Sequence, residues 1–179
     1  MKMETLQDVY IEELRDLYDA EQQLLKALPK MAKAATSPEL KSAFEEHLEI
    51  TQGQVNRLDQ VFDKLGEKPK GKKCEAMKGL IEEAKERMGE DIDEEALDVS
   101  LIVAAQKVEH YEIAGYGSVR CFAELLNRDE EADLLQETLD EEKDADDRLT
   151  DLAENSINVE AMGRTAVAEE TPEHAHGRR

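Results

Sequence analysis

The chain has 179 residues, of which 40% are hydrophobic, 37% charged and 4% aromatic, and its formal net charge is −21. The length fits one domain with a tail, and the scarcity of aromatic residues favours long helices over a sheet. The charge argues against nucleic acid as a partner, because phosphate binding needs clustered Lys and Arg. The acidic side chains either keep the protein soluble or converge in part to attract cations.

The first predicted helix extends from Leu6 to Met31. Its apolar residues recur at steps of three and four, which places them on one face of an amphipathic helix. That face carries Leu6, Tyr10, Leu14, Leu17, Glu21, Leu24, Leu28 and Met31. The sequence TSP at 36–38 ends this helix and starts the next, since Ser37 can cap and Pro38 suits a first helical position.

The second predicted helix has its apolar stripe centred near Thr51 and Val55. The Gly/Pro/Lys-rich sequence GEKPKGKK at 66–73 then predicts a loop. Helical spacing returns at 77–88, which predicts a shorter helix within a long connection.

The third long helix is predicted to start at an N-cap, Asp91 or Asp93, and to run to about Leu126. The sequence NRDEEADLL at 127–135 opens the fourth helix. From Asn155 the helical periodicity is lost. Residues 1–157 are therefore predicted to form the folded domain, and 158–179 a flexible tail.

These elements predict an all-α fold with four long helices. Short connections make the first and second helices, and the third and fourth, antiparallel neighbours. The long connection, roughly 66–94, can cross the length of the bundle and carries the short extra helix. One long crossover in a four-helix bundle is the ferritin-like arrangement.

Three of the four long helices place a glutamate in the middle of the apolar face. These residues are Glu21, Glu109 and Glu142, each about midway along its helix; Glu112 lies to one side of Glu109. Like charges in a dry interior disfavour joint ionisation, so a divalent or trivalent cation is the simplest partner. Oxygen ligands suit iron or manganese. A structural network of acids is the alternative.

The second helix shows no such glutamate. Its periodicity places Glu49 in solvent, Gln52 at the edge of the stripe, and His47 on the opposite flank as a surface or interface residue.

Four segments resemble the YciE/YciF-type stress proteins of the ferritin-like superfamily, over about residues 3–157. They are VYIEELRDLYDAEQQLLKALPKMA, HLEITQGQVNRLDQVF, AMKGLIEEA and AAQKVEHYEIAGYGSV. The resemblance implies a di-metal carboxylate site. By position, the resemblance implies that Glu21, Glu109 and Glu142 are metal ligands. It adds Glu49 as the glutamate of an ExxH pair on the second helix. The pair Glu109-x-x-Glu112 resembles the doubled glutamate pattern of rubrerythrin-like members.

The sequence departs from the superfamily pattern at both ExxH histidines. Gln52 stands three residues after Glu49, and Ala145 stands three residues after Glu142, with Asp146 next to it. Gln52 and Asp146 are then the further oxygen ligands to consider. Loss of two imidazoles removes donors that help to hold and tune a redox metal.

Two functions follow from the resemblance. The first is an iron-binding, or manganese-binding, oxidoreductase of the ferroxidase or peroxidase type that oxidises Fe(II) in a stress response. In such an enzyme, Glu49 and Glu142 would bridge the two metal ions, and Glu21 and Glu109 would be terminal ligands. Glu112 would be a movable extra ligand, and Tyr18 or Tyr116 would donate hydrogen bonds from outside the ligand set. The second is a non-catalytic stress or structural bundle with a degraded site, whose functional surface would be the His47/Leu48/Thr51 side of the second helix. In either case we expect a homodimer rather than a storage cage.

The sequence shows no signal peptide and no membrane span, so a cytoplasmic protein without a membrane partner is expected. Cys74 and Cys121 form no metal-binding or redox motif and predict ordinary free thiols.

Overall fold

The computed structural model describes the backbone of residues 3–70 and 73–169, and side chains as far as residue 163. Within these ranges the chain is helical and contains no strand. The helices are α1 (Leu6–Ala34), α2 (Pro38–Leu65), α3 (Glu75–Gly89), α4 (Glu94–Leu125), α5 (Asp129–Leu152) and α6 (Asn158–Glu169), with a π-helical segment, Ala153–Ile157, between the last two.

Helix boundaries coincide with local signals in the sequence. The Thr5 hydroxyl accepts a hydrogen bond from the backbone N–H of Asp8, and Ser37 does the same for Leu40. Gly66 ends α2 in the left-handed conformation, φ 67°, which costs glycine little. Asp93 does precede α4, but its side chain makes no capping hydrogen bond.

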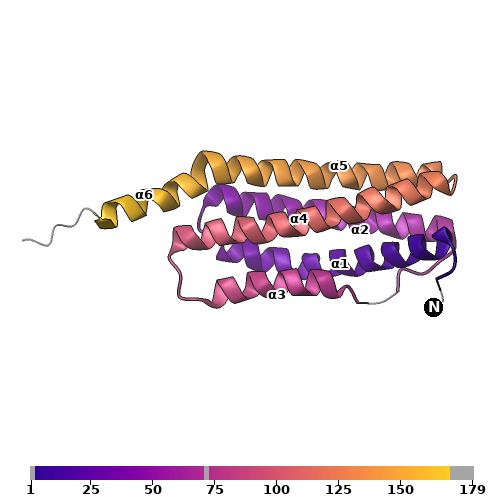
Figure 1. Ribbon diagram of the computed structural model, residues 1–179, viewed down its shortest axis with the longest axis horizontal. Helices are drawn as coiled ribbons and strands as arrows, with labels where there is room; N and C mark the ends of the chain where they lie inside the picture. The colour runs from indigo at the N-terminus through magenta and orange to yellow at the C-terminus, as the bar shows by residue number, and fades with distance from the viewer. Residues whose placement is uncertain (1–2, 71–72, 170–179) are drawn as a thin grey trace, which may run out of the picture.

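The four long helices α1, α2, α4 and α5 lie side by side as a bundle, and consecutive members of the pairs α1–α2 and α4–α5 are antiparallel (Figure 1). Helix α3 packs along α1 and α4 and returns the chain from the end of α2 to the start of α4. The predicted bundle, with one long crossover carrying a short helix, is therefore confirmed.

The turn between α1 and α2 is fastened to α4 by one buried carboxylate. Asp98 accepts hydrogen bonds from the backbone N–H groups of Thr36 (2.9 Å) and Ser37 (2.7 Å), and from the Thr36 hydroxyl (2.6 Å). These bonds satisfy the buried carboxylate and pair two backbone donors of the turn, and they fix α4 relative to the first hairpin.

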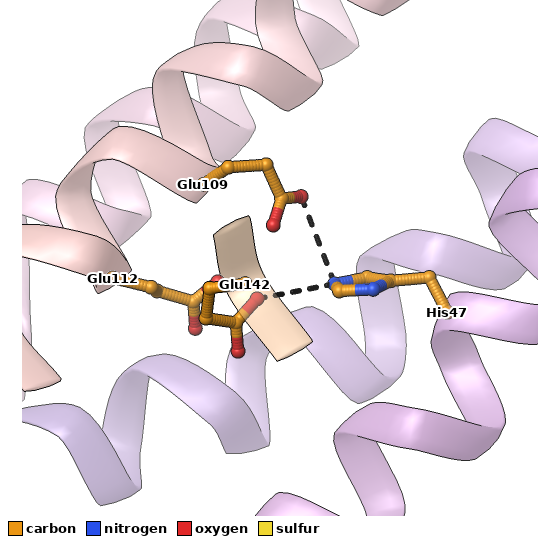
Figure 2. Close-up of side chains that lie close together, drawn as sticks. All are labelled: His47, Glu109, Glu112 and Glu142. Carbon is orange, nitrogen blue, oxygen red and sulfur yellow. Dashed lines mark ion pairs between the residues drawn. The ribbon is translucent and has the colours of Figure 1, made fainter. Parts of the chain in front are cut away.

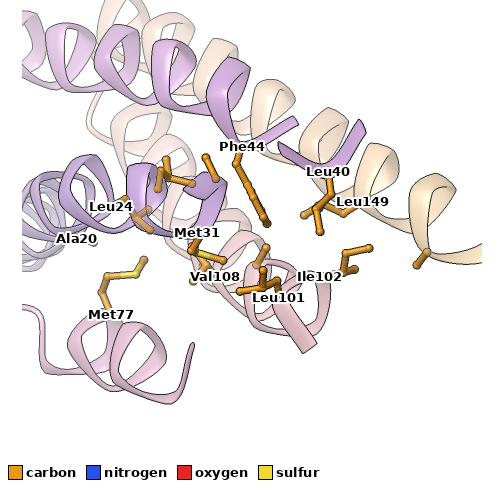
Figure 3. Close-up of a cluster of buried hydrophobic side chains, with 14 of the residues drawn as sticks. Ala20, Leu24, Met31, Leu40, Phe44, Met77, Leu101, Ile102, Val108 and Leu149 are labelled. Atoms are coloured by element: carbon orange, nitrogen blue, oxygen red, sulfur yellow. The ribbon is translucent and has the colours of Figure 1, made fainter. Parts of the chain in front are cut away.

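The apolar core is divided into two clusters. One contains Leu24, Met31, Leu40, Phe44 and Leu149 (Figure 3). The other contains Tyr10, Leu58, Phe62, Val119 and Leu135. Between them, along every long helix, lies a layer of buried polar side chains, which holds the candidate site.

The predicted loss of helical structure after Asn155 is wrong as far as the described backbone reaches. The π-helical segment continues α5, and α6 follows to Glu169, projecting away from the bundle (Figure 1). A π turn shifts the phase of side chains along a helix, so Ala153 and Ile157 stay buried although the 3.6-residue pattern is broken. Residues 170–179 of the predicted tail lie outside the described part.

Two further predictions concern the chain as a whole. Among the described residues, no helix is long and apolar enough to span a membrane. Both cysteines are free thiols, Cys74 buried and Cys121 exposed, as expected.

Candidate metal centre

The polar layer contains four buried glutamates and one buried histidine. Glu21, Glu112 and Glu142 are fully buried, Glu109 is 3% exposed and His47 is 8% exposed. All four long helices contribute: Glu21 lies on α1, His47 on α2, Glu109 and Glu112 on α4, and Glu142 on α5. On each helix these residues lie between the segments that form the two apolar clusters. The predicted convergence of Glu21, Glu109 and Glu142 at one height of the bundle is thus found in the structure.

Four of these side chains point toward a common point (Figure 2). One ligand atom from each of His47, Glu109, Glu112 and Glu142 lies within 4.8 Å of the others. The Nε2 atom of His47 is 3.6 Å from Oε1 of Glu109 and 3.8 Å from Oε2 of Glu142. Glu109 and Glu112 are one turn apart on α4, while His47 and Glu142 approach from α2 and α5.

Several buried atoms of this group have no hydrogen-bond partner in the part of the chain that the structure describes. They are Glu21 Oε2, Glu109 Oε2, both carboxylate oxygens of Glu112, Glu142 Oε2 and both ring nitrogens of His47. Buried polar atoms are nearly always paired, since leaving them unpaired costs free energy. A cation bound among them would satisfy these atoms, so the donor set fits a metal ion.

Burial controls the protonation of the carboxyl groups. It raises the pKa of Glu109 to about 8, and it raises the pKa of Glu112 well above its ordinary value, with nearby Glu21 and Glu142 adding to the shift. The pKa values of Glu21 and Glu142 are likewise raised, first by burial and then by neighbouring glutamates. A positive ion would reverse this preference and favour the carboxylates.

His47 is suited to act as a neutral ligand. Burial lowers the pKa of its imidazole to about 4, with a smaller contribution from the positive charge of Arg148. The ring is therefore uncharged at neutral pH, the form in which imidazole binds metals.

Outer residues hold the carboxylates in place. The Tyr116 hydroxyl donates to Oε1 of Glu21 at 2.5 Å, and Nε2 of Gln54 donates to Oε1 of Glu142 at 2.5 Å. Gln54 also reaches Glu141 at 3.2 Å, and Arg57 donates to that same carboxylate. Such supports orient metal ligands and tune their basicity.

The structure brings together most of the residues that sequence reasoning selected. Glu109, Glu112 and Glu142 form the group, Glu21 lies beside it, and Tyr116 contacts Glu21 as an outer donor. Tyr18 does not take part: its ring packs against Phe62, with ring centroids 6.0 Å apart, and burial raises its hydroxyl pKa, with a smaller effect from Asp59.

The assignments on α2 need correction. Glu49 and Gln52 are exposed, so the resemblance misplaced both, whereas the periodicity put Glu49 correctly in solvent. His47 was predicted to be a surface or interface residue, but it is buried and faces the cluster. The same finding removes His47 and Thr51 from the predicted functional surface on α2, since both are buried.

Asp146 lies outside the group as well. Its carboxylate accepts a hydrogen bond from Gln106 (3.3 Å) and is 3.4 Å from Nε2 of the exposed His110. The inward stripe of α2 was correctly centred near Thr51 and Val55, but His47 and Gln54 were not recognised as its polar members. Their spacing of four and three residues from Thr51 was the available signal.

Comparison with known proteins assigns the family. Residues 5–162 match the family described as a domain of unknown function, DUF892. Protein YciF of Escherichia coli K12 is 51% identical over 165 residues, which is 92% of this chain and 99% of that protein.

Solved structures show the same fold. The E. coli stress protein YciF superposes with a TM-score of 0.84, covering 87% of this chain and 99% of that chain. YcfI from Rhodopseudomonas palustris, named provisionally as a structural protein, gives 0.81 at 48% identity, covering 83% and 95%. A two-domain protein from Anabaena variabilis, with DJ-1/ThiJ/PfpI-like and ferritin-like domains, gives 0.60 at 19% identity, covering 98% of this chain and 42% of that one. The chain therefore belongs to the DUF892 family and has a ferritin-like fold.

Proposed function

We propose that this protein binds iron in its buried polar layer and oxidises Fe(II) with dioxygen or peroxide during stress. The observation that carries the proposal is the convergence of His47, Glu109, Glu112 and Glu142 within 4.8 Å, with unpaired donor atoms on all four. One imidazole among several carboxylates is a donor set that suits iron or manganese. The stress role is supported by the name of the E. coli relative.

Each side chain has a distinct task in this proposal. His47, Glu109, Glu112 and Glu142 would hold the metal, and Glu21 would supply the ligand for a second ion beside it. Bound iron would supply the electrons for the reduction of the oxidant. Tyr116 and Gln54 keep Glu21 and Glu142 in place through their hydrogen bonds. The apolar clusters on both sides exclude bulk water from the layer.

A non-catalytic structural role is the second candidate. Gln52 and Ala145 stand where the superfamily pattern has histidines, and His110 is exposed, so His47 is the one histidine that reaches the layer within the described residues. A protein with this donor set could bind metal for stability without turnover. The provisional name of the relative from R. palustris favours this reading.

Anaerobic titration with Fe(II), followed by exposure to dioxygen or peroxide, tests the proposal. We expect saturation at about two equivalents per chain, as in ferritin-like di-iron proteins, and Fe(II) oxidation measured by absorbance. Glu109→Ala should abolish both, because it removes a central ligand.

Glu49→Ala is the matched control, since it deletes an exposed glutamate of α2. Absence of metal binding, or equal binding by the Glu109→Ala and Glu49→Ala variants, would contradict the metal site. Tight binding without Fe(II) oxidation would favour the structural role.

We also propose that the protein is a homodimer, on the basis of its similarity to the smaller ferritin-like stress proteins. Light scattering of the purified chain should give twice the 20.2 kDa mass of one chain. A monomeric mass, or the mass of a large cage, would contradict this.

A further inference from the structure

A groove of about 180 Å³ lies between α1, α3 and α4. Its floor is apolar: Leu24, Met31 and Val108 line it, and all three belong to the buried cluster drawn in Figure 3. The half-buried side chains of Ile81 and Met88 form the wall on α3. No residue of the polar layer lines the groove within the part of the chain that the structure describes, so the groove is separate from the candidate metal centre.

Three lysines line the exposed edge of this groove. Lys26 and Lys30 lie one turn apart on α1, and Lys85 lies on α3. Because all three side chains are exposed, their ammonium groups can stay in water while their methylene stems cover apolar surface. Acidic residues outnumber basic ones by 44 to 23 in the whole chain. The charged residues that line this groove are nevertheless all lysines.

The charge of these lysines is only partly balanced. Lys85 donates a hydrogen bond to Glu82 at 3.0 Å. This bond is the main reason why the pKa of Glu82 is lowered, and the charges of Lys78 and Lys30 add smaller effects. Among the described residues, neither Lys26 nor Lys30 has a hydrogen-bond or ion-pair partner of its own. The groove therefore keeps positive charge with which an anion can pair.

The size of the groove suits a short alkyl chain. An apolar cavity of about 150 Å³ holds benzene, so a groove of about 180 Å³ has room for a chain of about six or seven carbons. Because the lysines are exposed, a charged head group beside them would remain partly hydrated and avoid the cost of full burial. The groove thus combines an apolar floor with a cationic edge.

We propose that this groove binds the anion of a medium-chain fatty acid with about eight carbons. Its alkyl chain would lie on the apolar floor, and its carboxylate would pair with Lys26, Lys30 and Lys85. A carboxylic acid of this kind is ionised at neutral pH, so its charge complements the lysines. Binding at this groove does not require the metal centre.

Titration of the metal-free, full-length protein with octanoate, followed by NMR of its backbone amides, tests this binding. Saturable shifts should appear at residues that line the groove, such as Lys26, Ala27, Ile81 and Ala84. Affinity should rise about threefold to fourfold for each methylene from butanoate to octanoate, because each one buries further apolar surface. Dodecanoate should gain little beyond octanoate, since the groove is then filled.

The head group is tested with ligands of equal chain length. Octanol, which is uncharged, and octylamine, which is cationic at neutral pH, should both bind more weakly than octanoate. This comparison uses the unmodified protein and does not depend on a variant's folding. Equal or tighter binding of octylamine would contradict the role of the lysines.

Removal of the lysine charges should weaken octanoate selectively. The double variant Lys26→Gln/Lys30→Gln should bind octanoate about threefold to tenfold more weakly and octanol unchanged. The double variant Lys41→Gln/Lys143→Gln is the matched control, since it removes two charges from α2 and α5, helices that do not line the groove. It should bind both ligands as the unmodified protein does.

A variant that fills the groove tests the place of the alkyl chain. Ala84→Leu should weaken octanoate binding by about tenfold or more, because the larger side chain occupies the space of the ligand. Ala145→Leu is the control, since Ala145 lines a separate hollow between α2 and α5. Failure of octanoate to bind, or binding by Ala84→Leu as tight as by Ala145→Leu, would overturn the proposal. Self-association that Ala84→Leu abolishes, without octanoate binding, would instead assign the groove to a second copy of the chain.

Discussion

Glu109 illustrates the chemistry of the buried layer at the scale of one residue. Burial raises the pKa of its carboxyl group from 4.5 to about 8, and the carboxylates of Glu112 and Glu142 lie beside it. In the metal-free protein, Glu109 therefore holds a proton at neutral pH. Metal binding must displace that proton, which makes binding dependent on pH.

The raised pKa of Glu109 has a defined effect on stability. Between pH 6.5 and 8 the folded state keeps a proton on Glu109 that the unfolded state has lost, so the free energy of unfolding falls as pH rises. His47 opposes this trend slightly: its imidazole is neutral in the folded state, with a pKa of about 4, but about half protonated in the unfolded chain at pH 6.5, so its contribution raises the free energy of unfolding by about 0.4 kcal/mol between pH 6.5 and 8.

We therefore predict that the metal-free protein loses at least about 1 kcal/mol of stability between pH 6.5 and 8, since Glu21, Glu112 and Glu142, whose pKa values are also raised, act in the same direction as Glu109. Urea denaturation at several pH values would measure it. Glu109→Gln should reduce the dependence without abolishing it, whereas Glu49→Gln, at an exposed site, should leave it unchanged. A slope of the opposite sign would contradict the assigned protonation state.

Sequence reasoning found the glutamates of the layer better than its other members. Glu21, Glu109 and Glu142 were visible because each interrupts an apolar stripe. His47 was missed although it is rotated by only about 40° from Thr51 on a helical wheel. The periodicity placed the inward face of α2 correctly near Thr51, but neither Thr51 nor Gln54 is acidic, so the glutamate ligand assigned on this helix was Glu49, which the resemblance implied and which lies about 160° from Thr51.

At the scale of elements, Asp98 connects α4 to the turn between α1 and α2. It accepts from two backbone N–H groups and one hydroxyl, and it is only 3% exposed. The bonds hold three of the bundle helices in register at one end. Correct register is what brings residues of α1, α2 and α4 to the same height in the layer.

Replacement of Asp98 by Ala should destabilise the protein by about 2–3 kcal/mol, because it removes three hydrogen bonds that a buried carboxylate accepts from the turn. The free energy of unfolding in urea measures the loss. Asp91→Ala is the control, since Asp91 precedes the same helix but is exposed. Equal stability of the two variants would show that the contact to the turn contributes little.

The helices themselves were predictable because their signals are local. Ser37, Pro38 and Gly66 mark boundaries through their own backbone preferences. The continuation of α5 into the segment Ala153–Ile157 was not predictable in this way, because a π turn breaks the pattern that identifies a helix. Burial of Ile157 against the core, a tertiary effect, keeps that segment helical.

At the scale of the whole molecule, the polar layer separates two apolar clusters that share the same four helices. Each cluster can stabilise its own half of the bundle through apolar burial. The layer between them contributes little of that kind and instead confines carboxyl groups whose pKa values are raised by burial. A metal ion that displaced protons from these groups and bound them would also couple the stability of the two halves.

The divided core therefore has a consequence for cooperativity. In the metal-free protein, backbone amides near the layer, such as those of Thr51 and Glu112, should open more readily than amides within either cluster. Native-state hydrogen exchange should then show two protected blocks separated by a faster-exchanging seam, and manganese or iron should slow exchange at the seam most. If all amides were equally protected from exchange, and metal did not change that protection, the expectation would be contradicted. The continuous helices alone, without the ion, would then make the two halves unfold together.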